Sequence, residues 1–496
     1  MSWNADRAKS RIREHLKTVP NVDRHVALDS AILTEDMRKR GLMGRLPLNE
    51  AFVVEGAHLY GRLLDFENLV SEGGQETEAS HRKLLRFLNM HYRIWDSIVD
   101  GDDGDRVDYH GARLHAVINS PAGDPVAQIA RAVALARKLT EAAQKVGQAH
   151  GFPSRIRFGI DHGKCLAMTT GRGAHEKDTL FLGRPANHAA KLVSSGTEQG
   201  IFLTETAQKR AAAGAVRKSA GTMTLDEAYV QDAVKRFGFD SLERTASAVA
   251  LDFSEPMFRF KRPSLPLSKV KFNELTPANS IRMGMASVFA DIDGFTSFVD
   301  GAIDGGSEKI REAVKIVHVI REELNDVLKE DFGGKRIRFI GDCIHGCVAE
   351  GEHADDAARS VRQAVLCASA MRSSFDLCLE AVRSEAAIDL AVGIEYGQTP
   401  MTRLGHRGDD SVRCAASRAT IEAERTQQAV EHGGIRLGTV ASSVADPAVR
   451  KNFSSGRLMS FDAASDLLWT AQAPAVQILR NEPAARSHAM PREPRA

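Results

Sequence analysis

The chain has 496 residues, of which 43% are hydrophobic and 26% charged, and its formal net charge is +1. It is too long for one hydrophobic core, so two or more domains are expected. The balanced charge argues against a nucleic-acid partner, and no apolar run is long enough to cross a bilayer. The N-terminus lacks the apolar centre of a signal peptide, and the six cysteines have no zinc-type spacing. A reducing, cytoplasmic location without a membrane partner is predicted.

The periodicity of the first half predicts a βαββαβ order with a further helix and strand appended. A strand is followed by a helix, a hairpin, a second helix, another strand and a third helix. In chain order these segments are residues 50–63, 80–99, 105–120, 125–146 and 155–168, with the third helix from 187.

The second half repeats this order after residue 284. Its strand, helix, hairpin, helix, strand and third helix are residues 286–292, 308–330, 333–350, 354–375, 387–398 and 414–430. The hairpins overlay without a gap, since RFIGDCIHGCV from Arg338 matches DYHGARLHAVI from Asp108. An internal duplication is therefore predicted.

The domain division follows from this duplication. We expect an N-terminal helical segment at 1–47, a first domain at 48–258, a linker at 259–283, a second domain at 284–480 and a disordered tail at 481–496. Each domain should be an α/β (α+β) unit with a mixed or antiparallel sheet and helices packed outside.

Two carboxylates stand out in the second half. Asp291 ends an apolar strand in VFADIDGFTSF, and Asp342 occupies the hairpin turn in RFIGD. Adjacent strands would bring both into one small volume, where two carboxylates repel each other unless divalent cations bind there. Gly294 would let the following backbone, through Thr296, approach phosphate oxygens.

These motifs resemble the class III nucleotidyl cyclases, whose paired metal motifs are FxDIxGFT and KxxGD. The resemblance implies ferredoxin-like domains that pair face to face, as a pseudo-heterodimer here, and convert a nucleoside triphosphate to a 3′,5′-cyclic monophosphate and pyrophosphate. It implies two Mg²⁺ or Mn²⁺ ions. The ligands would be Asp291, Ile292 and Asp342, and the triphosphate would lie at Gly294, Phe295 and Thr296.

The defects of the two halves are complementary. The family's VNxAxR motif carries a ribose-orienting Asn and a transition-state Arg, and ANHAAKL in the first half matches it with Asn187 and Lys191. That half has Ala112 at the second metal position and at best Glu55 at the first. In the second half RCAASR would put Cys414 at the Asn position and Arg418 at the Arg position. We expect one competent site, with metals from one half and Asn187 and Lys191 from the other.

The base-reading positions are unusual for this family. The Lys and Asp that read adenine become Asp108 and Leu180, and the residues that read guanine are absent too. Asp108 could accept from the amine of cytosine, and Tyr109 could stack on a base or fill the volume that a smaller pyrimidine leaves. The pattern resembles the Pycsar antiphage cyclases, which make cyclic CMP or cyclic UMP for a partner effector. UTP or CTP is therefore the favoured substrate.

Alternatives remain open at this point. The chain could be an adenylate cyclase with unorthodox base contacts, a non-catalytic nucleotide-binding regulator, or a pair of decayed pseudoenzyme halves. A homodimer could also set second half against second half and join Asp291 and Asp342 to Arg418 of another copy. The sequence leaves the activator and the effector unidentified.

Overall fold

A computed structural model of the protein describes residues 3–22, 50–71, 75–99, 104–170, 178–219, 222–237, 257–406, 411–430 and 433–470. The predicted tail at 481–496 and residues 23–47 of the predicted N-terminal segment lie outside these described residues. Within the described ranges, no helix has the length and apolar character needed to cross a membrane.

The N-terminal elements and the first half, residues 50–237, follow the predicted order. They are α1 (Ala5–His15), η1 (Leu16–Thr18), β1 (Ala51–Leu63), α3 (Phe66–Val70), α4 (Glu78–Val99), β2 (Asp105–His110), β3 (Arg113–Ile118), α5 (Pro125–Ala149), β4 (Ile156–Thr170), β5 (Asp178–Leu182), α6 (Arg184–Ser194), β6 (Gly200–Leu203), α7 (Glu205–Arg210), β7 (Val216–Ser219), β8 (Thr222–Leu225) and α8 (Glu227–Arg236). The main sheet has the order β2-β3-β1-β4-β5, with β6 beside β4.

The second half, residues 257–470, repeats this plan. Its elements are β9 (Phe260–Lys261), η3 (Leu267–Lys269), η4 (Phe272–Glu274), β10 (Ser280–Asp293), α10 (Phe295–Asp304), α11 (Ser307–Asp326), η5 (Val327–Asp331), β11 (Lys335–Ile340), β12 (Cys343–Val348), α12 (Ala357–Val382), β13 (Asp389–Leu404), β14 (Val412–Ala415), α13 (Arg418–Gln428), β15 (Ile435–Leu437), α14 (Thr439–Val444), α15 (Pro447–Phe453) and α16 (Phe461–Thr470). The sheet order β11-β12-β10-β13-β14 mirrors the first.

The two sheets also share one register, which confirms the predicted duplication and fold class. Tyr60 and Phe289 mark the same strand position in the two halves. Each pairs with a histidine on one neighbouring strand and a glycine on the other, namely His115 and Gly159 in the first half and His345 and Gly393 in the second. Both hairpins turn at a glycine with positive φ, Gly111 at 51° and Gly341 at 60°, which side chains rarely adopt.

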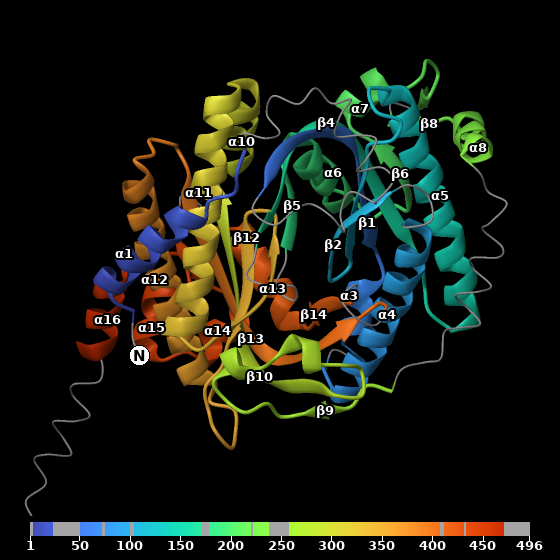
Figure 1. The fold of residues 1–496 in the computed structure, drawn as a ribbon. Coiled ribbons are helices and arrows are strands. Elements are labelled where there is room, and N and C mark those ends of the chain that lie inside the picture. The colour runs from blue at the N-terminus through green and yellow to red at the C-terminus, as the bar shows by residue number, and fades with distance from the viewer. Residues whose placement is uncertain are drawn as a thin grey trace, which may run out of the picture.

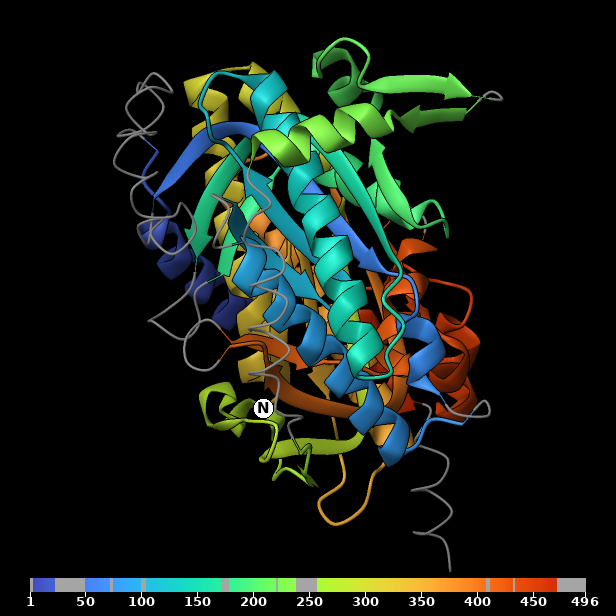
Figure 2. The ribbon, with the colours of Figure 1, turned by 90° about the vertical axis from the view of Figure 1, so that its right-hand side faces the viewer.

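Helices cover both faces of each sheet (Figures 1 and 2). The pairs α4–α5 and α11–α12 form the outer layers, while α6 and α13 lie between the two sheets. The first turns of α5 and α12 are stabilised by the side chain of the residue that precedes each helix. Asp124 before α5 and Asp356 before α12 each accept a backbone N–H from the first turn, as N-cap residues do.

The two halves share a core at their contact. Leu166, Met168, Leu180 and Leu182 belong to β4 and β5, yet they pack into the apolar cluster of the second half with residues such as Ile292. The predicted linker at 259–283 also packs against the second sheet. Its strand β9 pairs in parallel with β10, and Leu267 and Phe272 are buried there.

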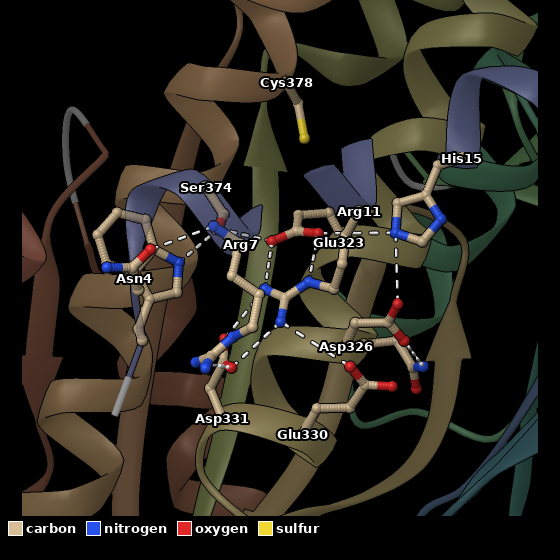
Figure 3. A network of polar contacts seen from close by, with 12 residues as sticks. Asn4, Arg7, Arg11, His15, Glu323, Asp326, Glu330, Asp331, Ser374 and Cys378 are labelled. Atoms are coloured by element: carbon tan, nitrogen blue, oxygen red, sulfur yellow. Dashed lines mark hydrogen bonds and ion pairs between the residues drawn. The ribbon is translucent and has the colours of Figure 1, made fainter. Parts of the chain in front are cut away.

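The N-terminal helix α1 lies on the second half, against α11 and α12 (Figure 1). Figure 3 shows the polar contacts that hold it. Arg11 contacts Glu323 at 2.7 Å and Asp331 at 3.0 Å, and His15 lies 3.3 Å from Asp326. Burial alone would lower the pKa of His15, but Asp326 and Glu323 raise it to about 9. Charge pairs therefore bind the first helix to the second half of the chain.

Candidate active site

Asp291 and Asp342 lie side by side, as the sequence predicts. Ala290 pairs with Ile344 in the β10–β12 ladder, which puts Asp291 next to the turn that carries Asp342. The two carboxyl groups lie close enough to influence each other's protonation, and Gln427 of α13 donates a hydrogen bond to the Asp291 carboxylate at 3.4 Å. Burial and then the charge of Asp293 raise the pKa of Asp291 to about 6, while burial and then Asp291 raise that of Asp342.

The chemistry of this pair fits a hard divalent cation. The pKa values of both carboxyl groups are raised first by burial and then by a neighbouring carboxylate, Asp293 for Asp291 and Asp291 for Asp342, and a bound cation would offset both effects. Across the part of the chain that the structure describes, no cluster of three or more His, Cys, Asp or Glu side chains could hold a metal ion. An ion at Asp291 and Asp342 would therefore need further oxygen ligands from the backbone, water or a triphosphate.

The backbone after Asp291 forms the start of α10. Gly294 has φ 78°, and a Cβ there would lie 2.7 Å from the Ala387 carbonyl oxygen. The Phe295 side chain is buried in the core, so only its backbone amide could approach a phosphate. Thr296 in the same turn keeps a partly exposed side chain. A helix N-terminus of this kind favours anions.

Asn187 of α6 reaches this turn from the other half. Its Nδ2 donates a hydrogen bond to the Thr296 hydroxyl. At the start of α6, the Arg184 backbone amide donates to the Asp300 carboxylate of α10 at 2.8 Å. Lys191 follows Asn187 by one helical turn, so both lie on the same helix face, and Lys191 is exposed. The structure thus brings the predicted Asn to the half that carries the two aspartates, with Lys191 one turn further along the same helix face.

Of the three predicted base-reading residues, Asp108 is partly exposed, whereas Leu180 and Tyr109 are buried. Asp108 is one-third exposed and contacts Arg338 of β11 at 2.5 Å. Leu180 is buried where β5 meets the second half. The proposal that Tyr109 stacks on a base is wrong, because Tyr109 is fully buried and packs against Tyr92 and Trp95 of α4. Successive strand residues point to opposite faces, so Tyr109 faces the outer helices.

A pseudo-symmetric counterpart of this site lies at the same interface; we call it the degenerate site, and the first the competent site. The shared register sets Arg62, and not Glu55 as predicted, at the position of Asp291. Glu55 pairs with Lys164 further along β1. Ala112 stands at the position of Asp342, as expected. The degenerate site thus carries an arginine where the competent site carries a carboxylate.

The predicted counterparts of Asn187 and Lys191 in the second half were also misplaced. Cys414 lies in β14 and pairs with Thr402, just as Leu180 pairs with Met168, so it matches the base-reading position. Gly159 packs under Ala189 of α6, and Gly393 packs under Ala423 of α13. This equivalence matches Arg418 with Arg184, Ile421 with Asn187 and Arg425 with Lys191.

Ion pairs cross the degenerate site. Arg425 lies 2.6 Å from Glu67, the counterpart of Thr296, and Glu67 also contacts Arg62 at 3.2 Å. The hairpin residue Arg113 pairs with Glu424 of α13. This site therefore pairs its own charges and has neither the two aspartates nor the asparagine.

Comparisons with known proteins agree with this geometry. Residues 63–236 match the family of adenylate and guanylate cyclase catalytic domains. A uridylate cyclase of a Rhizobium species is 39% identical over 94% of this chain and 95% of that protein. A uridylate cyclase of Pseudomonas aeruginosa is 35% identical over 92% of this chain and 89% of that protein. The chain belongs to the class III nucleotidyl cyclase family.

A solved structure shares the fold of nearly the whole chain. The crystal structure of a class III adenylyl cyclase-like ATP-binding protein from Pseudomonas aeruginosa matches with a TM-score of 0.84 and 33% identity, covering 94% of this chain and 100% of that chain. The predicted enzyme class, a nucleotidyl cyclase, is confirmed. The family match falls on the first half of this cyclase, which lacks the two aspartates.

Sequence reasoning missed a group of interface residues in this cyclase. Asp178 at the start of β5 contacts Arg336 of β11 and Arg413 of β14. Burial would raise the pKa of Asp178, but the two arginines lower it to about 2. Arg338, the partner of Asp108, stands at the Lys position of its own hairpin motif, RFIGD. The hairpin overlay, which aligns Arg338 with Asp108, was the sequence signal that could have indicated a relationship between these two residues.

Proposed function

We propose that this cyclase converts UTP to 3′,5′-cyclic UMP and pyrophosphate at the competent site of a single chain. The observation that carries the proposal is the contact between Asn187 and Thr296, which joins the half with the intact VNxAxR-like motif to the half with Asp291 and Asp342. The substrate class comes from the two uridylate cyclases that resemble nearly the whole chain. In this proposal residues 48–258 supply the transition-state and base contacts, and residues 284–480 supply the aspartates.

Asp291 and Asp342, with the backbone of Ile292, would hold two Mg²⁺ or Mn²⁺ ions. When bound, such ions activate the 3′-hydroxyl and neutralise the triphosphate. The backbone amides of Phe295 and Thr296, at the N-terminus of α10, would bind phosphate oxygens, because the helix dipole and its free N–H groups favour negative charge.

Asn187 and Lys191 would act on the reacting part of the substrate. Asn187 would exchange its partner Thr296 for the ribose and hold the 3′-hydroxyl in line with the α-phosphorus. Lys191 would place a positive charge beside the phosphoryl group as negative charge builds in the transition state. Lysine offers a point charge and not a bidentate fork, so this contact is less directional than that of an arginine.

Asp108 and Arg338 offer complementary groups to a pyrimidine. The carboxylate can accept the N3–H of uracil, and the guanidinium can donate to a carbonyl oxygen next to it. Cytosine could use the same pair through its amine and N3, so the pair favours a pyrimidine without choosing between the two. Uracil is chosen here because both curated relatives are uridylate cyclases.

A nucleotide panel tests the proposal. Purified protein is incubated with ATP, GTP, CTP or UTP plus Mn²⁺, and the products are identified by mass spectrometry. Cyclic UMP is expected, with none from Asp342→Ala. Asp108→Asn should raise the KM for UTP about tenfold or more, because the charge-assisted hydrogen bond is lost. No product from any nucleotide with folded protein would contradict the enzymatic assignment.

ATP is the second candidate substrate, because the matched crystal structure is described as an ATP-binding protein. The adenine-reading Lys and Asp of the family are replaced by Asp108 and Leu180, which leaves the adenine amine and ring nitrogens without their usual partners. Cyclic AMP as the main product would keep the two-metal chemistry and overturn the role given to Asp108.

We further propose that the product is a cytoplasmic second messenger of antiphage defence, read by a cyclic-nucleotide-binding effector. This part rests on the sequence resemblance to the Pycsar cyclases. It predicts that cells carrying the gene and its neighbouring effector restrict phage growth, and that Asp342→Ala abolishes this restriction. Equal phage titres with the wild-type and variant cyclases would contradict it.

A further inference from the structure

The hairpin turns of both halves are held from behind by a helix. In the first half Tyr92 of α4 donates its hydroxyl hydrogen to the Gly111 carbonyl oxygen at 2.7 Å. In the second half Arg321 of α11 donates from its guanidinium to the Gly341 carbonyl oxygen. Both glycines have positive φ. The same backbone atom of each turn is therefore fixed by a different side chain.

Arg321 is held firmly at this place. Its side chain has no exposed surface, and its guanidinium carbon lies 3.7 Å from the centre of the Phe339 ring. A buried cation is costly without hydrogen bonds and nearby negative charge. The hydrogen bond goes to Gly341, and the nearby negative charges include Asp178 and Asp342.

The two halves differ in the residue after the glycine. In the first half Ala112 follows Gly111, and the side chain that holds the Gly111 carbonyl is the neutral Tyr92. Asp342 comes after Gly341, beside Asp291, and there the helix supplies a cation. The stacking on Phe339 and the bond to the carbonyl keep the guanidinium behind the turn, so it does not fill the space between the two carboxylates.

We propose that Arg321 is a positioning residue that fixes the Gly341–Asp342 turn, so that the Asp342 carboxylate is presented beside Asp291 for cation binding. The residue touches no substrate and acts through the backbone. Asp178, at the start of β5 in the first half, is close enough for its negative charge to act on the same guanidinium. The strand that carries the base-reading position Leu180 therefore also contributes a charge near Arg321. This inference rests on the cation-binding role proposed above for Asp342.

The test measures Mn²⁺ binding directly, by electron paramagnetic resonance of free Mn²⁺ in the presence of a non-reactive UTP analogue. Arg321→Met keeps an unbranched apolar stem in the buried site but removes the charge and the hydrogen-bond donors. We expect its Mn²⁺ dissociation constant to rise about tenfold, which corresponds to about 1.4 kcal/mol. Arg321→Lys should recover part of the loss. Tyr92→Phe, the matched change in the other half, should leave Mn²⁺ binding unchanged.

The outcomes separate this inference from the proposed function. Equal Mn²⁺ binding by wild type and Asp342→Ala would overturn the metal role of Asp342 itself. Weaker binding by Asp342→Ala with normal binding by Arg321→Met would overturn only the role of Arg321. An equal loss in Arg321→Met and Tyr92→Phe would overturn it too, because it would indicate a general loosening of the interface. If Arg321→Met does not fold, Arg321→Lys and Arg321→Gln carry the comparison, with circular dichroism as the check of folding.

Discussion

Arg62 of β1 and Asp291 of β10 occupy the same register position in two sheets of one plan. One duplicated position therefore carries opposite charges in the two halves. At Asp291 the neighbour across the turn is Asp342, and the pair suits a cation. At Arg62 the neighbour is Glu67, at 3.2 Å, and the charge is already compensated. The chain thus has two geometrically related sites but the chemistry for one reaction centre.

Asn187 gives the sharpest test of this asymmetry. Asn187→Ala is expected to lower kcat about 100-fold with little change in KM, because the amide aligns the attacking hydroxyl. Ile421→Ala, the matched change at the degenerate site, should stay within about twofold of wild type. Steady-state kinetics of cyclic nucleotide formation measure both.

The same variant tests whether the site forms within one chain. A mixture of Asn187→Ala and Asp342→Ala proteins should remain inactive, because neither chain has a complete site. Recovery of activity on mixing would show that halves of different chains pair. Loss of activity in Arg418→Ala alone would favour pairing of two second halves.

The aspartate pair predicts a metal-dependent effect of pH on stability. The pKa of Asp291 is raised from its ordinary value of 3.8 to about 6, so the folded protein binds more protons than the unfolded chain between these values. Without divalent cations, stability should therefore fall as pH rises through this range. Mn²⁺ should raise the Tm more at pH 7.5 than at pH 5, as measured by calorimetry. Asp342→Asn, which removes one of the two carboxylates proposed to bind the cation, should lose this response; an undiminished Mn²⁺ response would count against the site.

Lys191 is expected to contribute charge to the transition state. Lys191→Ala should lower kcat by about 10- to 100-fold, because one positioned charged group contributes on the order of 2 kcal/mol. Lys191→Arg should retain the charge and at least part of the activity. The control is Arg425→Ala on the opposite helix, which removes the ion pair with Glu67 and should leave kcat within about twofold. Equal losses at Lys191 and Arg425 would contradict the assignment of one competent site.

His15 predicts how the N-terminal helix depends on pH. Asp326 and Glu323 raise its pKa to about 9 in the folded protein against the effect of burial, so the imidazolium stabilises the fold at low pH. This stabilisation should be complete below about pH 6.5 and lost as pH rises through about 9. The Tm difference between wild type and His15→Gln should shrink to near zero over that range.

The control for this experiment lies on the same segment. Lys17 forms an exposed ion pair with Glu14 at 2.7 Å, and such pairs contribute little to stability. Lys17→Gln should change the Tm slightly and equally across the range. A His15→Gln difference that persists at pH 10 would indicate that packing, and not charge, sets the role of His15.

The features of this protein that depend on local pattern could be predicted before the structure was known. Hydrophobic periodicity and the ungapped hairpin overlay predicted both repeats, and the expected adjacency of their strands in one sheet predicted that Asp291 and Asp342 would lie close together. Such features can be predicted from the sequence because the alternation of strand residues and the length of a tight turn fix which positions face each other across neighbouring strands.

The remaining features depend on how distant parts of the chain pack against each other. Asp108 and Tyr109 are neighbours in sequence, yet one reaches Arg338 and the other is buried in the core, because strand residues alternate between faces and register decides which face is which. The match of Arg425 with Lys191 likewise depends on how α13 packs over a glycine of β13. Arg321 reaches Gly341 from another element, and no spacing along the chain encodes that contact. Side-chain partners of this kind are set by long-range packing, which the sequence pattern leaves open.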